Sequence, residues 1–111
     1  MEDCLFCNFD NHELIEEGKY CYARRDGYPV SEHHTLIIPK RHVASYFDLE
    51  EPELLDMHQM LVKMKARIEE WDATVSGFNV GVNAGKDAGQ SIFHVHMHLM
   101  PRRKGDIQNP Q

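Results

Sequence analysis

Apolar residues alternate with polar or small residues along four short stretches of the chain, and this period of two predicts β-strands. The four stretches cover residues 19–24, 34–39, 76–83 and 94–100. Residues 34–39 are mostly apolar, which is typical of a central strand that is buried on both faces. Pro101 follows the last stretch and is expected to end it, because proline cannot donate a hydrogen bond to a neighbouring strand.

A longer stretch, residues 48–71, has the spacing of an amphipathic helix. Asp48 is the expected N-cap, because Glu51 three residues later completes a capping-box pattern and Pro52 suits the first turn. Apolar side chains recur at helical spacing and are expected to form a stripe against the core: Leu54, Met57, Leu61, Met64, Ile68 and Trp71. Local patterns therefore predict four strands and one long helix.

The composition is that of a globular protein. The chain has 111 residues, 41% hydrophobic and 27% charged, so we expect a single domain over residues 1–111. The formal net charge of -6 disfavours general nucleic-acid binding, although a local basic patch can still hold a nucleotide. No apolar run approaches the ~20 residues of a membrane span, and the N-terminus lacks a signal-peptide pattern. We therefore expect a cytoplasmic protein with no membrane partner.

Three histidines at every second position are the most informative feature of the sequence. In a strand, His94, His96 and His98 share one face while the apolar residues between them pack behind. Imidazole can be a nucleophile, an acid or a base near pH 7, so the middle ring could attack phosphorus while its neighbours orient it. Alternating histidines on a strand can equally converge on zinc. The triplet alone leaves both interpretations open.

Two further motifs are each ambiguous when taken alone. Cys4 and Cys7 suit two zinc ligands on a tight turn, but they could also be a redox pair or two buried small side chains. Three cysteines in all indicate a reducing compartment rather than a disulfide scaffold. Residues 83–91 form a glycine-containing loop that leads into the histidines. Such a loop can cradle an anion on its backbone N–H groups or can be an ordinary hairpin connection.

The stretch from Gly89 to Arg102 contains the pattern His-φ-His-φ-His-φ-φ, with φ an apolar residue, and resembles the signature of the histidine triad (HIT) family. Residues 34–42 are similar to a second block of that family, and the resemblance extends from Cys4 to Asp106. It implies an α+β fold, a five-stranded antiparallel sheet with one long and one short helix, usually in a homodimer. The fifth strand and the short N-terminal helix are expected from the resemblance alone.

The resemblance also implies catalytic roles. His96 would be the nucleophile that attacks the α-phosphate and forms a covalent nucleotidyl-histidine, which water then hydrolyses. His98 would hydrogen-bond a nonbridging oxygen or the leaving group. A strand carbonyl or His34 would set the tautomers of these rings.

Other residues are expected, by the same resemblance, to hold the nucleotide. The ribose would be contacted by Asp26 and Gly27, and the phosphate and leaving group by Asn83, Gly89, Gln90 and Ser91. Four apolar residues could wall the base or could simply belong to the core: Leu5, Phe6, Phe9 and Leu36.

The resemblance also bears on zinc. Several bacterial-type members of the family bind zinc through residues that correspond here to Cys4, Cys7, His42 and His94. Two thiolates and two imidazoles make a closed, structural zinc site. In that case His94 would bind zinc and not phosphate.

Details of the signature favour a hydrolase. His98 occupies the third triad position, where the nucleotidyl-transferase branch has glutamine, and the Arg102 segment resembles dinucleoside-polyphosphate hydrolases. The Asn83 loop also occurs in nucleoside phosphoramidases. We therefore expect a hydrolase that cleaves a purine dinucleoside polyphosphate such as diadenosine tetraphosphate at the α-phosphate. The alternatives are a phosphoramidase, which cleaves AMP-amine conjugates, and a non-catalytic zinc- or nucleotide-binding module.

Overall fold

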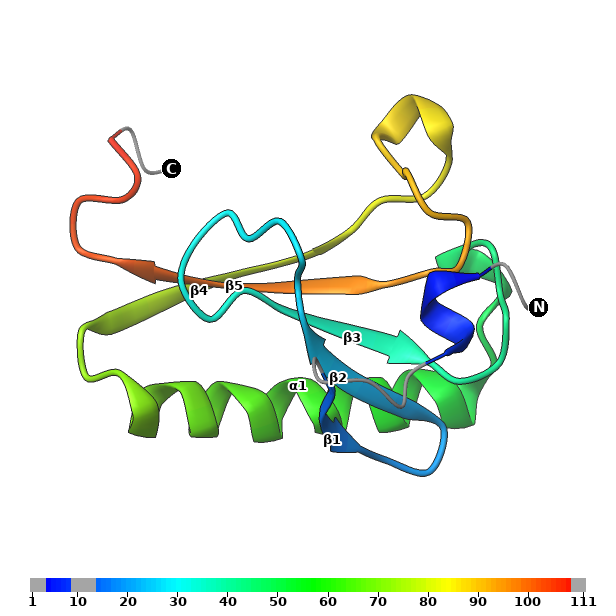
Figure 1. Ribbon diagram of the computed structural model, residues 1–111, viewed down its shortest axis with the longest axis horizontal. Helices are drawn as coiled ribbons and strands as arrows, with labels where there is room; N and C mark the ends of the chain where they lie inside the picture. The colour runs from blue at the N-terminus through cyan, green and yellow to red at the C-terminus, as the bar shows by residue number, and fades with distance from the viewer. Residues whose placement is uncertain (1–3, 9–13, 109–111) are drawn as a thin grey trace.

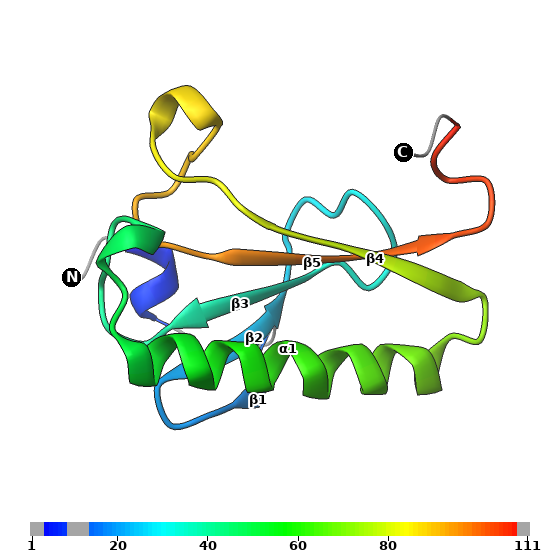
Figure 2. The same ribbon diagram turned by 180° about the vertical axis from the view of Figure 1, so that it is seen from behind.

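The computed structural model describes residues 4–8 and 14–108 of the chain. Within these residues, five antiparallel strands form one sheet in the order β1-β2-β3-β5-β4, and one long helix, α1, lies along one face of it (Figures 1 and 2). The bounds are β1 Leu14–Glu17, β2 Cys21–Arg25, β3 Thr35–Pro39, α1 Glu51–Trp71, β4 Val75–Val82 and β5 Met97–Arg103. The five-stranded sheet and the long helix are confirmed, and the short N-terminal helix is a single 3-10 turn, Leu5–Cys7.

The larger apolar core lies between α1 and the sheet. Side chains alternate along β2, so that Cys21 and Ala23 face the helix and are fully buried. The other buried members of this core are Ile37, Met57, Met60, Met64, Ile68 and Leu99.

The apolar stripe on α1 is confirmed at its centre and wrong at its end. Met57, Met64 and Ile68 are fully buried as predicted, and Met60 joins them. Trp71, however, is 48% exposed, because its ring lies beside the guanidinium group of Arg25 and the ring of His33 rather than in the apolar core. Within the described residues, no helix combines the length and the apolar character needed to cross a membrane.

The start of α1 differs from the prediction. Glu50, not Asp48, is the N-cap, and the side chains of Glu50 and Glu53 form the capping box. Asp48 instead ends a 3-10 turn, Tyr46–Asp48. The reason is a long-range contact: Arg41 donates to both carboxylate oxygens of Glu53, at 2.9 and 2.8 Å, and to the carbonyl of Asp48 at 3.2 Å.

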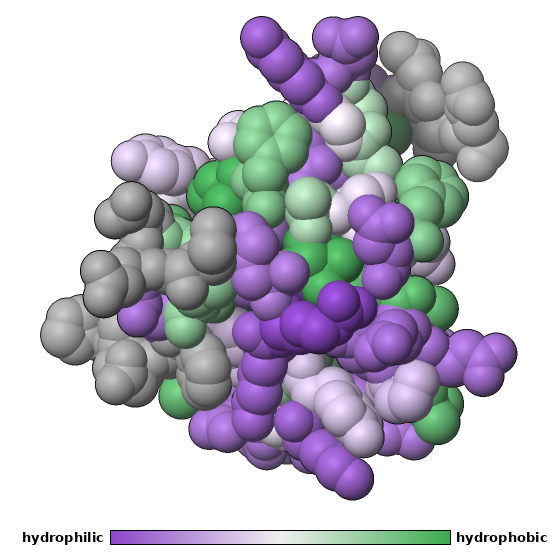
Figure 3. All heavy atoms as spheres, turned by 90° about the vertical axis from the view of Figure 1, so that its right-hand side faces the viewer, coloured by the Kyte–Doolittle hydropathy of each residue, from purple (hydrophilic) through white to green (hydrophobic). Residues whose placement is uncertain are grey.

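The face of the sheet opposite α1 carries a smaller apolar cluster of Phe6, Tyr22, Leu36 and Ile38. The N-terminal turn packs here, and the hydroxyl of Tyr22 donates to the carbonyl of Phe6 at 2.5 Å. Figure 3 looks onto the end of the molecule where this turn and the loop 83–91 lie, and hydrophilic side chains gather at the centre of that end. The sheet face opposite α1 is the one that carries the candidate site.

The histidine stretch is extended, but it is only partly a strand. β5 begins at Met97, so His94 and His96 precede it, held by the N–H of Val95, which donates to the carbonyl of Val43 at 2.7 Å. The prediction that Pro101 ends the strand is wrong. β3 pairs only with Met97–Leu99, so Pro101 has no strand beside it on that side and its missing N–H leaves nothing unpaired there.

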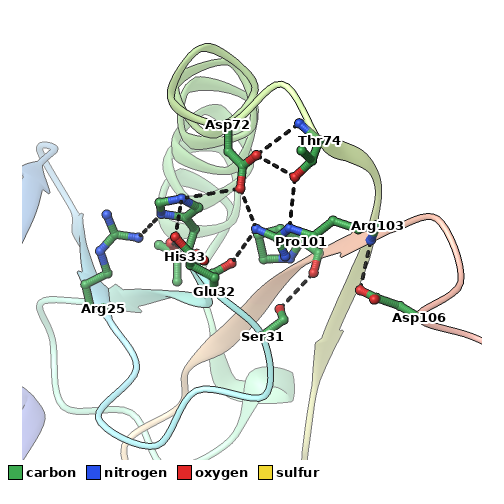
Figure 4. A network of polar contacts seen from close by, with 10 residues as sticks. Arg25, Ser31, Glu32, His33, Asp72, Thr74, Pro101, Arg103 and Asp106 are labelled. Atoms are coloured by element: carbon green, nitrogen blue, oxygen red, sulfur yellow. Dashed lines mark hydrogen bonds and ion pairs between the residues drawn. The ribbon is translucent and has the colours of Figure 1, made fainter.

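The loop 26–34, which joins β2 to β3, is fastened at the far end of β5 (Figure 4). Arg103 forms an ion pair of 2.8 Å with Asp72, and its hydrogen bond to that carboxyl holds the pKa of Asp72 well below its usual range. The hydroxyl of Ser31 donates to the carbonyl of Pro101 at 2.7 Å. Nη2 of Arg103 also donates to the carbonyl of Glu32 at 3.3 Å. The hydrogen bonds of Ser31 and Glu32 position a loop whose two ends both reach the candidate site.

Candidate functional site

A cavity of about 280 Å³ opens on the sheet face opposite α1. It collects side chains from the N-terminal turn, the loop 26–34, β3, the loop 83–91 and the histidine stretch. Most of the residues predicted to act on a nucleotide line it: Asp26, His34, Asn83, Gly89, Ser91, His96 and His98. Segments that are far apart in the sequence therefore meet in one place.

The apolar residues predicted to wall a base are divided by the structure. Phe6 and Leu36 line the cavity, whereas Leu5 does not and is 53% exposed. Phe9 lies outside the described residues. Gly27 lies between the lining residues Asp26 and Tyr28 in the sequence but does not itself line the cavity.

Three lining residues were not foreseen from the sequence: Tyr28, Val30 and Ile92. Tyr28 is 93% exposed, and the composition of the residues around it predicts only a turn. An aromatic side chain in a turn, directly after a candidate ribose contact, was the available signal.

His96 is oriented by the backbone two residues before it. Its Nδ1 lies 3.0 Å from the carbonyl oxygen of His94, which can only accept, so Nδ1 carries the proton. In the neutral ring the other nitrogen, Nε2, then keeps a free electron pair. The ring is 9% exposed and lies edge-on to Phe6, with 5.0 Å between ring centroids. A proton on Nδ1 and a free electron pair on Nε2 are what a nucleophilic imidazole needs.

His34 sets the tautomer of His98. The N–H of Val30 donates to Nδ1 of His34 at 3.0 Å, so the proton of a neutral His34 is on Nε2. That Nε2 lies 2.9 Å from Nδ1 of His98 and 3.3 Å from Oδ2 of Asp26. Because Nδ1 of His98 accepts, the proton of His98 is on its Nε2, where it can be donated into the cavity.

Burial keeps this pair neutral. Desolvation lowers the pKa of His34 and of His98 below the ordinary value of 6.5. For His98 the neighbouring rings of His96 and His34 lower the pKa further. At pH 7 the order of donors and acceptors from Val30 through His34 to His98 is therefore intact.

Asp26 is the first residue of the loop 26–34. Its Oδ1 accepts from the N–H of Tyr28 at 2.8 Å, which is the turn-capping role open to any such aspartate. Its Oδ2 faces the two rings of His34 and His98, at 3.3 and 3.8 Å. The carboxylate is thus within the cavity, where it can also accept from a hydroxyl group of a ligand.

The loop 83–91 is built around Gln90. The side chain of Gln90 is 4% exposed and does not line the cavity; instead it hydrogen-bonds backbone groups of the loop and its neighbours. Gly89 has φ of 93° and ψ of 12°, a left-handed conformation that glycine adopts without strain. A Cβ at this position would come within 3.5 Å of Nδ2 of Asn83. The loop therefore presents Asn83, Gly89 and Ser91 to the cavity, while Gln90 holds it from behind.

The four residues predicted to bind zinc converge beside the cavity. Sγ of Cys4 lies 3.4 Å from Nδ1 of His94, and Sγ of Cys7 lies 3.3 Å from Nδ1 of His42 and 3.6 Å from Nδ1 of His94. All four potential ligand atoms lie within 4.8 Å of one another.

These distances fit a tetrahedral ion. Zinc bonds of about 2.0–2.3 Å place neighbouring ligand atoms roughly 3.3–3.8 Å apart, which is the range of the contacts above. The outer nitrogen of His94, Nε2, lies 2.7 Å from the carbonyl of Pro39, the kind of hydrogen bond that orients metal-bound histidines. His94 thus faces the two thiols, whereas His96 and His98 face the cavity.

Comparison with known proteins identifies the family to which the chain is similar. The model of the HIT domain family matches residues 10–105. Adenosine 5'-monophosphoramidase HNT1 of Saccharomyces cerevisiae is 38% identical over 104 residues, which are 90% of this chain and 63% of the yeast protein. The asymmetrical bis(5'-nucleosyl)-tetraphosphatase of Schizosaccharomyces pombe is 40% identical over 79 residues, 71% of this chain and 43% of that protein. A zinc-bound histidine triad family protein from Mycobacterium smegmatis has a TM-score of 0.86 at 29% identity, covering 97% of this chain and 81% of that one.

Proposed function

Because this chain belongs to the histidine triad family, we propose that it is a nucleotide hydrolase that cleaves dinucleoside polyphosphates, of the diadenosine tetraphosphate type, at the α-phosphate. The observation that carries the proposal is the hydrogen bond of 3.0 Å between Nδ1 of His96 and the carbonyl of His94. It leaves Nε2 of His96 as a nucleophile in a cavity large enough for part of a nucleotide.

The first step forms a bond between Nε2 of His96 and the α-phosphorus. The bond from phosphorus to the bridging oxygen breaks, and its electron pair departs with the leaving nucleoside polyphosphate. The ring of His96 becomes cationic, and its Nδ1–H bond to the His94 carbonyl stabilises that charge. Nε2–H of His98 donates to a phosphate oxygen during this step.

The second step is hydrolysis of the nucleotidyl-histidine. A water oxygen bonds to phosphorus, the phosphorus–nitrogen bond breaks, and its electron pair returns to Nε2 of His96. The proton lost by the water goes to solvent, and the nucleoside monophosphate is released. The chain is then in its starting protonation state.

A phosphoramidase is the second candidate, and the His34–His98 pair favours it. A departing amine must gain a proton, and Nε2–H of His98 is a donor beside the reacting centre. The relative HNT1, whose name gives it this activity, is 38% identical to this chain. Both candidate reactions use His96 in the same way and differ only in the leaving group.

The test compares wild type with His96→Ala on diadenosine tetraphosphate and on adenosine 5'-phosphoramidate. Wild type should release AMP and gain one adenylyl mass transiently, and His96→Ala should do neither. His58→Ala is the matched control, because His58 is an exposed histidine on α1 that does not line the cavity. The faster substrate decides between the two reactions. Turnover that persists in His96→Ala refutes the mechanism, and binding without turnover in wild type favours the non-catalytic module.

We also propose that Cys4, Cys7, His42 and His94 bind one structural zinc ion. The tetrahedral spacing of their ligand atoms supports this, as does the zinc-bound relative. Metal analysis of tag-free protein should find one zinc per chain, lost in Cys4→Ser. Cys21→Ala is the control, since Cys21 lies in the core under α1 and should leave the zinc content unchanged. Zinc-free wild type would overturn the proposal.

We further propose a homodimer that forms along β4. In the described part of the chain no strand pairs with the outer edge of β4, and Val80 on this strand is 56% exposed. Light scattering should give a dimer mass for wild type and a monomer mass for Val80→Asp. Leu55→Asp is a matched control, because Leu55 is similarly exposed but lies on α1 near Tyr20. A monomeric wild type would refute the proposal.

A further inference from the structure

Arg102 is a half-buried cation that forms no ion pair within the described part of the chain. Its Nε donates to Oδ1 of Asn79 at 2.7 Å, the one hydrogen bond that its guanidinium group makes among these residues. The neighbouring Arg103, in contrast, is paired with Asp72 at 2.8 Å. Asn79 holds the guanidinium group on one side only, and the Nη groups of Arg102 can still donate to an anion.

Arg102 lies in the same row of side chains as His98. Side chains alternate along β5, so His98, Met100 and Arg102 point to one face, the face opposite α1 on which His98 lines the cavity. Desolvation is the main cause that lowers the pKa of His34, while the charge of Asp26 raises it and the charge of Arg102 lowers it. The charge of Arg102 therefore acts on the histidine pair of the proposed active site.

A trough leads from the cavity toward Arg102. It begins as a hollow of about 250 Å³ whose further lining residues are Gly81 and Met100. The hollow shares four lining residues with the cavity: Val30, His34, Asn83 and His98. A second hollow of about 470 Å³ is lined by Arg102, and Val30 borders the cavity and both hollows. We use the word trough for these two hollows together.

The trough is open because β4 carries glycine beside it. Gly81 pairs with His98 and Gly77 pairs with Arg102, so both glycines face the same side of the sheet as their partners. A Cβ at either glycine would meet no heavy atom within 4 Å, and neither residue has a positive φ. The backbone could accept a side chain at both positions, and its absence leaves room next to His98.

We infer that the trough holds the leaving half of a dinucleoside polyphosphate, and that the Nη groups of Arg102 donate to its distal phosphate. Arg102 follows His98 by four residues, about 13 Å along an extended strand. A nucleoside monophosphate ends at the reacting phosphate, so only a longer chain of phosphates can extend from His96 to Arg102. The inference rests on the proposed function for the place of the reacting phosphate, and it adds a subsite for the leaving group.

The charges around the second hollow divide it between phosphate and ribose. Glu32 and Asp106 line this hollow together with Arg102. Carboxylates repel phosphate but accept hydrogen bonds from hydroxyl groups. The distal phosphate therefore belongs at Arg102 and the second ribose beside the two carboxylates. The amine released from a phosphoramidate is too small to use either, so the trough serves only the dinucleoside polyphosphate reaction.

Calorimetric binding of diadenosine tetraphosphate and of AMP tests the subsite without turnover, in chains that all carry His96→Ala. Arg102→Met should weaken the binding of diadenosine tetraphosphate about ten-fold, the lower end of what a hydrogen bond to a charged group contributes, and should leave the binding of AMP unchanged. Lys104→Met is the matched control, because it removes the same charge from an exposed residue that lines neither hollow. It should change neither affinity.

Gly81→Val tests the trough independently of charge. The valine side chain should occupy the space beside His98 and weaken the binding of diadenosine tetraphosphate, with AMP binding retained. No change in either variant would overturn the subsite. An equal loss for AMP in Arg102→Met, or an equal effect of Lys104→Met, would overturn it too.

The subsite and the hydrolase can fail separately. If the chain with His96 intact hydrolyses diadenosine tetraphosphate and Arg102→Met leaves kcat/KM unchanged, the subsite is wrong and the hydrolase stands. If that chain does not hydrolyse diadenosine tetraphosphate but Arg102→Met selectively weakens its binding, the hydrolase is wrong and the subsite stands.

Discussion

Replacement of Gln90 tests whether this residue acts on the substrate or on the fold. Its Nε2 donates to the carbonyls of Ala44 and Ile92, at 2.6 and 3.1 Å, and its Oε1 accepts from the N–H of Gly85 at 2.8 Å. The side chain is buried behind the loop 83–91. Gln90→Leu keeps the volume nearly constant but leaves these three backbone groups without their partner.

The expected loss of stability follows from that count. Each hydrogen bond contributes about 1 kcal/mol, so three lost bonds give an upper value of about 3 kcal/mol. Gly85 and Ala44 are exposed residues, and water can replace part of the loss, so we expect about 2 kcal/mol. For 111 residues the unfolding entropy is roughly 230 cal/mol/K, and the Tm should fall by roughly 9 °C.

Thermal unfolding followed by circular dichroism measures this change. Ser91→Ala is the control, because Ser91 is exposed on the same loop, and its Tm should stay within about 1 °C of wild type. In hydrolysis assays Gln90→Leu should raise KM, since the loop that presents Gly89 to the cavity is loosened. The reasoning is refuted by a Gln90→Leu variant that unfolds like wild type and yet has lost turnover. Gln90 would then contact the substrate, as the sequence resemblance implies.

Three further outcomes can be checked on the same protein. Because burial lowers the pKa of His34 and of His98, NMR titration of these two imidazoles should give midpoints below pH 6.5, and a midpoint at or above that pH would contradict the neutral pair. Met64→Ala, at a fully buried core position, should cost about 3 kcal/mol and lower Tm by roughly 13 °C, with exposed Lys65→Ala changing it little; a loss below ~1 kcal/mol would be inconsistent with the packing. A chelator should lower the Tm of wild type but not that of Cys7→Ser, and equal responses would argue against a shared metal.

Most of the fold could be predicted because its signals are local. Period-two patterns located four strands and helical spacing located α1. β1 could not be found this way, since Leu14–Glu17 is four residues long, ends in two glutamates and pairs with β2 through a bulge. The helix start was misplaced because the partner of Glu53 is Arg41, which lies on another segment.

In the candidate site, too, features that depend on neighbouring residues could be predicted, and features that depend on distant residues could not. The three histidines are one local motif, so the joint placement of His96 and His98 in one cavity could be predicted from the sequence, whereas His94 lies toward the two thiols. The tautomer of His98, in contrast, depends on the N–H of Val30 and on the ring of His34 across the sheet, which no local pattern encodes.

The N-terminal turn Leu5–Cys7 joins the two candidate sites through neighbouring residues. Cys4 and Cys7 belong to the cysteine–histidine cluster that we propose binds zinc, and Phe6 between them lines the cavity and contacts the ring of His96. Whatever holds one side of this turn orders the other. By thermodynamic linkage, metal that tightens nucleotide binding by a given factor must itself be bound more tightly, by the same factor, once the nucleotide is present. When zinc is scarce, molecules without nucleotide would then lose the metal first, and molecules with bound nucleotide would keep it longest.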